Sequence, residues 1–128
     1  MSYCFSTTLD DNFDKVIEKV TEELKKEGFG ILTEIDVKET FKKKLDVDFR
    51  KYRILGACNP QMAHKAIQAE RRIGTMLPCN VIVQETDDGK IEVSAVDPVA
   101  SMQAVENKEL EPVASQVRDK LEKVISSL

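Results

Sequence analysis

Two long segments of this chain place their apolar residues on a single helical face, and this pattern constrains the fold more than any other feature. The first apolar stripe lies between Phe13 and Leu24, and the second lies between Leu110 and Leu128. Apolar residues spaced three and four positions apart line one face of a helix, which must then be buried against another element. A chain with two such helices needs a further layer that covers both stripes.

Strand-like segments alternate with these helices. Aromatic, β-branched and alternating residues predict strands at 2–9, 29–36, 51–57, 80–85 and 91–96. The last two are joined through Asp88-Gly89, a pair typical of tight antiparallel hairpins. Shorter helices are expected at 37–45, from Pro60 to Gly74 and at 98–105. We therefore predict a single domain over residues 1–128, with an α+β fold in two layers.

The charge balance limits the classes of partner. The 128 residues include 19 Lys and Arg against 23 Asp and Glu, which gives a net charge of −4. Nucleic-acid binding normally leaves a basic surface, so we expect no nucleic-acid partner. No apolar run approaches the roughly 18 residues that cross a bilayer, and residues 1–4 carry no basic leader. We expect a cytoplasmic protein with no membrane partner.

Two of the three cysteines lie at junctions between predicted elements. Cys58 follows a strand and precedes the helix that Asn59 caps, whereas Cys79 precedes the strand that contains Asn80. The dipole at a helix N-terminus favours an anion, and so favours the thiolate form of Cys58. If the two strands are neighbours in the sheet, the two thiols lie close together. Cys4, within the first strand, is expected to pack in the core.

These residues leave three kinds of chemistry open. His64 lies one turn into the helix after Cys58, so Cys58, Cys79 and His64 form a candidate metal site, with Asp97 as a fourth ligand. Such a set suits zinc, or copper in its reduced state. Alternatively, the two cysteines form a reversible redox pair. In the third interpretation they are small residues packed in tight junctions, and His64 is an exposed helix residue.

The rest of the sequence contains no further motif that indicates a phosphate-binding, metal-binding or catalytic site. The five glycines are scattered singly, so there is no Gly-rich phosphate loop, and the single histidine excludes multi-histidine metal sites. No catalytic motif stands out, which favours a non-enzymatic domain but leaves an enzymatic role of the cysteines open. Met62, Met76 and Met102 either fill gaps in the core or line a pocket, because methionine adapts to irregular shapes.

Three segments together resemble a known family. They are the helix start Cys58-Asn59-Pro60, the run Ile73-Gly74-Thr75-Met76-Leu77-Pro78-Cys79-Asn80-Val81 and the turn Asp97-Pro98. The combination is similar to the bacterial and archaeal domain-of-unknown-function 302 family. The resemblance implies a fold like that of the TATA-box-binding protein, in which helices pack on one side of a curved antiparallel sheet, and it implies a homodimer. It implies no activity.

The residues and the resemblance lead to one main expectation. We expect a homodimeric domain that binds a small ligand or a metal near Cys58 and Cys79, with Asn59, Asn80 and Asp97 in the ligand-binding set. One alternative is a thiol redox protein that uses the two cysteines. The other is a structural or adaptor module without a small-molecule site.

Overall fold

The computed structural model describes residues 2–128 and shows a five-stranded antiparallel sheet. The strand order is β1-β5-β4-β3-β2, and every neighbouring pair is antiparallel. The strands are β1 (Cys4–Leu9), β2 (Gly30–Asp36), β3 (Tyr52–Cys58), β4 (Cys79–Glu85) and β5 (Ile91–Val96). The predicted α+β class and the two-layer arrangement are confirmed.

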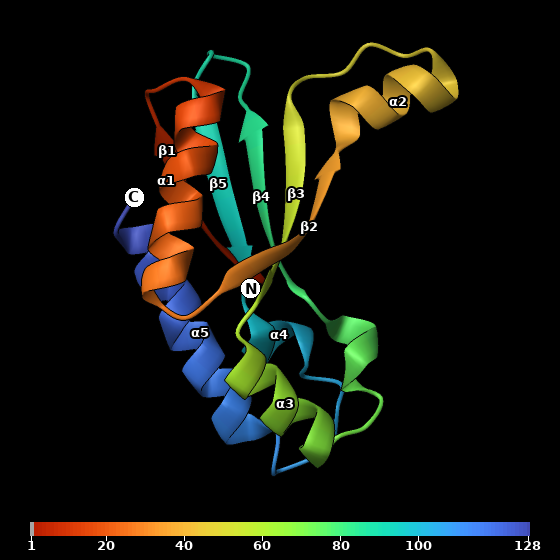
Figure 1. The fold of residues 1–128 in the computed structure, drawn as a ribbon, viewed down its shortest axis with the longest axis vertical. Coiled ribbons are helices and arrows are strands. Elements are labelled where there is room, and N and C mark those ends of the chain that lie inside the picture. Colours follow the sequence, from red (N-terminus) through yellow and green to blue (C-terminus); the bar gives the residue numbers. More distant parts are fainter. Residues whose placement is uncertain (1) are drawn as a thin grey trace.

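The two long helices, α1 (Phe13–Lys26) and α5 (Glu111–Ser126), pack on one face of this sheet (Figure 1). Their apolar stripes meet the inward side chains of the central strands. The resulting main core is fully buried at its centre, which includes Val16, Val20, Leu24, Leu55, Val81, Val83, Val93 and Leu121. Burial of this apolar surface is the main stabilising contribution to such a two-layer domain.

The helix α2 (Val37–Leu45) extends beyond one end of the sheet (Figure 1). Its side chains are only partly covered, and the ring of Phe41 packs edge-on against Phe49 with the centroids 5.1 Å apart. The basic run Lys42–Lys44 is exposed on this helix, where Lys42 and Lys43 pair with nearby carboxylates.

A second group of short elements lies at the opposite end of the sheet (Figure 1). It contains α3 (Pro60–Ala69), the 3₁₀ turn η1 (Ile73–Met76) and α4 (Pro98–Ser101). The prediction that α3 continues to Gly74 is wrong, because the side-chain amide of Asn107 donates to the carbonyl of Ala69 at 2.8 Å and closes the helix there. The predicted helix 98–105 is likewise shorter and ends at Ser101.

This end of the molecule has its own small core. Ala66, Ile73, Met102, Leu110 and Ala114 form a buried cluster that is separate from the main core. Among the described residues, Leu77 and Val113 are the partly buried ones that pack against both clusters. The domain therefore has a seam between a sheet-based core and an end-cap core.

Cys4 is not part of either core. It is half-buried on the face of the sheet that α1 and α5 leave uncovered, with its sulfur 3.8 Å from the Ser6 hydroxyl. Side chains alternate between the two faces along a strand, and the neighbouring Phe5 packs against the main core. No helix in the described part of the chain is long and apolar enough to cross a membrane.

Candidate functional site

The strand pairing brings Cys58 and Cys79 close together, as predicted. Strands β3 and β4 are neighbours, and Ala57 lies directly opposite Cys79. Cys58 is therefore diagonal to Cys79, and both residues line the same small cavity. Cys79 is buried in the main core, whereas Cys58 is half-buried.

Burial sets the chemical state of Cys79. Removal of the thiol from water, with a smaller effect from the nearby Cys58, raises the pKa of Cys79 from 9.0 to about 11. The side chain is therefore a neutral thiol at neutral pH, and it is a poor nucleophile in the folded state. This behaviour fits a wall residue better than an attacking cysteine.

The buried thiol predicts the order of alkylation by iodoacetamide. With a pKa of about 11, about one Cys79 side chain in a thousand is ionised at pH 8. Mass spectrometry of the folded protein should show Cys4 and Cys58 modified well before Cys79. Modification of Cys79 as fast as Cys4 in the folded protein would contradict this description of the site.

The same shift predicts a loss of stability at high pH. The pKa of the Cys79 thiol is higher in the folded than in the unfolded protein. The contribution of the protonated thiol to the free energy of unfolding is therefore complete below about pH 9 and is lost as the pH rises towards 11. The expected loss is roughly 2–3 kcal/mol. Urea unfolding at pH 8 and pH 10.5, compared between the wild type and Cys79→Ala, isolates this contribution. Equal losses in both proteins would show that the Cys79 pKa is not raised by folding.

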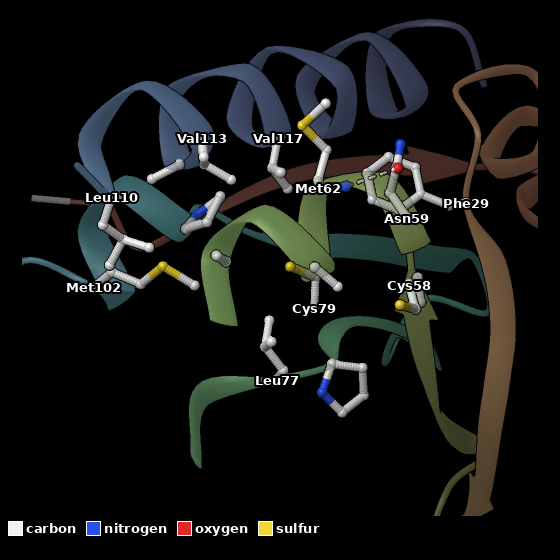
Figure 2. A pocket seen from close by; sticks show the side chains of 16 residues that line it. Phe29, Cys58, Asn59, Met62, Leu77, Cys79, Met102, Leu110, Val113 and Val117 are labelled. Carbon is white, nitrogen blue, oxygen red and sulfur yellow. Dashed lines mark hydrogen bonds between the residues drawn. The ribbon is translucent and has the colours of Figure 1, made fainter. Parts of the chain in front are cut away.

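A small apolar cavity of about 40 Å³ lies beside Cys79, in the seam between the two cores (Figure 2). Of the residues that the structure describes, those lining the cavity include no charged one. They come from the segment before β2, the end of β3, the start of β4 and the residues before it, α3, α4 and the segment after it, and the first half of α5. The largest wall side chains are Phe29, Met62, Leu77, Met102, Leu110, Val113 and Val117.

Asn59 has two structural roles at the edge of this cavity. Its side-chain oxygen accepts a hydrogen bond from the Met62 backbone N–H at 3.3 Å and so caps α3. Its side-chain nitrogen donates to the Glu27 carbonyl at 3.2 Å, which ties the end of α1 to the start of α3. A side chain at Gly28 would crowd this amide, since its Cβ would lie 3.0 Å from the Asn59 nitrogen. Asn59 thereby holds the backbone of Met62 in the cavity wall.

Asp97 lies outside the cavity and holds α4 in place. Its carboxylate accepts hydrogen bonds from the backbone N–H groups of Val99 and Ala100, and it pairs with Arg118 of α5 at 3.3 Å. The next residue, Pro98, lines the cavity. Asp97 therefore supports the wall without facing a ligand.

The remaining predicted site residues lie elsewhere. His64 is exposed on α3 and does not line the cavity, and Asn80 is exposed on β4 opposite Gly56. Within residues 2–128, no three His, Cys, Asp or Glu side chains come close enough to hold a metal ion. The structure thus does not assemble the predicted zinc or copper ligands Cys58, Cys79, His64 and Asp97.

Sequence reasoning missed most of the cavity wall. Phe29, Leu110 and Val113 look like ordinary core residues, because nothing in an apolar stripe shows where packing stays incomplete. The methionine signal was informative in part: Met62 and Met102 line the cavity, while Met76 is largely exposed outside it.

Comparisons with known proteins agree with this architecture. A family model described as "Domain of unknown function DUF302" matches residues 5–128. The chain belongs to the DUF302 family. The crystal structure of an uncharacterized conserved DUF302 protein from Bacillus stearothermophilus is similar over 98% of each chain, with a TM-score of 0.91 and 25% identity. No curated protein matches the sequence. Membership of DUF302 therefore fixes the fold and assigns no activity.

Proposed function

We propose that this DUF302 protein binds a small apolar ligand in the seam cavity beside Cys79. The observation that supports this most is the composition of the wall. Sixteen residues from the main core, the end-cap cluster and their neighbours surround the cavity, and within the described chain none of them is charged. Ligand sites in proteins are commonly concave and mostly apolar, with few polar groups.

The wall of the seam cavity contains flexible side chains that can adjust to a ligand. The cavity of about 40 Å³ is small, but the flexible side chains of Met62 and Met102 form part of its surface. Methionine has three rotatable bonds and fits irregular shapes, so both side chains can move to accommodate a larger guest. Leu77 and Val113 pack against both the end-cap cluster and the main core, so the cavity wall combines residues of two separate clusters.

The other proposals have less support. Two thiols alone provide only half of a tetrahedral zinc site, and thiol redox chemistry needs an ionisable Cys79, whose pKa burial raises. An adaptor without a site would not need an apolar cavity at the seam. The homodimer and the cytoplasmic location stay predictions, which light scattering of the purified protein and cell fractionation check.

Isothermal titration calorimetry with 1-octanol tests the proposal. We expect saturable binding with one site per chain and a negative heat-capacity change, because apolar surface is buried. Titrations with zinc and with reduced copper are the comparison, and neither metal is expected to bind stoichiometrically at pH 7. Stoichiometric metal binding without octanol binding would replace the apolar-ligand proposal with the metal one.

A further inference from the structure

We infer that the ligand of the seam cavity is an amphiphile with an anionic head, such as a medium-chain carboxylate. This inference rests on the proposed function and names the ligand class for the same site. It is based on a second, open hollow that adjoins the cavity and carries charge where the cavity carries none.

The two hollows share part of their walls. Asn59 and Met62 line both the apolar cavity and an outer hollow whose other wall residues are Lys26, Glu27, Gly28, Pro60, Gln61 and Lys120. Figure 2 shows Met62 and Asn59 together at one side of the cavity, next to Phe29. Movement of the Met62 side chain would therefore connect the apolar cavity to the outer hollow, which is polar and open to the surface.

Helix α5 contributes residues to the walls of both the apolar cavity and the outer hollow. Val113 and Val117 line the apolar cavity, and Lys120 lines the outer hollow. These three residues are spaced four and three positions apart, so they lie on one face of the helix. The same helical face is apolar deep in the seam and becomes cationic at the surface, as the binding site for an anionic amphiphile requires.

The charges of the outer hollow leave one cation without a local partner. Lys26 pairs with Glu23 at 2.9 Å, and Glu27 pairs with Lys123 at 3.4 Å. Among residues 2–128, Lys120 has no carboxylate within 4 Å. The local excess is positive although the whole chain has a net charge of −4. A carboxylate placed here gains a partner, whereas a quaternary ammonium head meets a like charge.

Calorimetry with three probes of equal tail length tests the head-group inference. The probes are octanoate, 1-octanol and octyltrimethylammonium, each below its micelle concentration, so that binding reports the free amphiphile and not a lipid surface. We expect octanoate to bind about three- to tenfold more tightly than 1-octanol, and the cation to bind most weakly. Added salt should weaken the binding of octanoate and leave that of 1-octanol unchanged.

Charge reversal at one lysine identifies the responsible group. Lys120→Glu should reduce octanoate affinity about three- to tenfold without changing 1-octanol affinity. Lys25→Glu changes the net charge equally at an exposed lysine outside both hollows, and should leave both affinities unchanged. Binding of 1-octanol as tight as that of octanoate would overturn the anionic head while leaving the apolar site intact. Failure of both probes to bind would overturn the proposed function itself.

Discussion

Replacing Ala63 with phenylalanine is expected to reduce 1-octanol binding at least tenfold. Ala63 lies on α3 in the cavity wall and is half-buried. A phenyl ring at this position takes up the space of a cavity of about 40 Å³, so ligand and side chain compete for the same volume. The affinity loss is measured by calorimetry on both proteins under the same conditions.

An identical substitution outside the cavity provides the control. Ala104 is exposed after α4 and does not line the cavity, so Ala104→Phe should bind 1-octanol like the wild type. Urea unfolding of Ala63→Phe checks that the variant is folded, and a modest stability change of about 1–2 kcal/mol is compatible with a filled cavity. If a folded Ala63→Phe bound 1-octanol with wild-type affinity, the ligand would lie elsewhere.

Replacing Gly56 with alanine is expected to destabilise the fold by about 1–3 kcal/mol. Gly56 is buried in β3, opposite Asn80 of β4. A Cβ atom here would meet the hydroxyl of Thr33 and would lie 2.8 Å from Cγ of Pro78. The threonine hydroxyl can rotate away, but the proline ring is rigid and lines the cavity, so the backbone has to shift.

Gly74 offers the matched control for this substitution. In the described part of the chain, no atom beyond Gly74 and its sequence neighbours comes within 4 Å of a Cβ built at this position. Gly74→Ala should therefore leave the free energy of unfolding within about 0.5 kcal/mol of the wild type. The two variants are compared by urea unfolding at pH 7. Equal stabilities would show that the strand end at Pro78 is not tightly packed and that the cavity wall there is loose.

The periodicity of the sequence was sufficient to predict the main layers. The stripes from Phe13 to Leu24 and from Leu110 onwards form α1 and α5, and the Asp88-Gly89 pair joins β4 to β5. These elements follow from local spacing and turn chemistry, which act over a few residues. The end of α3 could not be predicted in this way, because a side chain 38 positions away, Asn107, closes it.

The candidate site was predictable only in part. The unusual position of Cys79 at a junction directed attention to the region where the cavity lies, and the strand pairing confirms that Cys58 is a neighbour of Cys79. The cavity found there is lined by uncharged residues, and the described residues do not assemble the metal ligands that the residue types favoured, because His64 is exposed on α3 and Asp97 pairs with Arg118. A cavity reflects incomplete packing between two clusters, and neither periodicity nor composition records how well distant side chains fit.

Methionine-methyl NMR tests the central proposal, an apolar ligand in the seam cavity, most directly. Two of the four methionines, Met62 and Met102, line the cavity, while Met76 lies outside it and is 39% exposed. Titration of 1-octanol into protein labelled with ¹³C at these methyl groups should shift the Met62 and Met102 signals together, with one binding constant, and leave Met76 unchanged. Saturating 1-octanol that leaves Met62 and Met102 unshifted would contradict the seam cavity as a binding site.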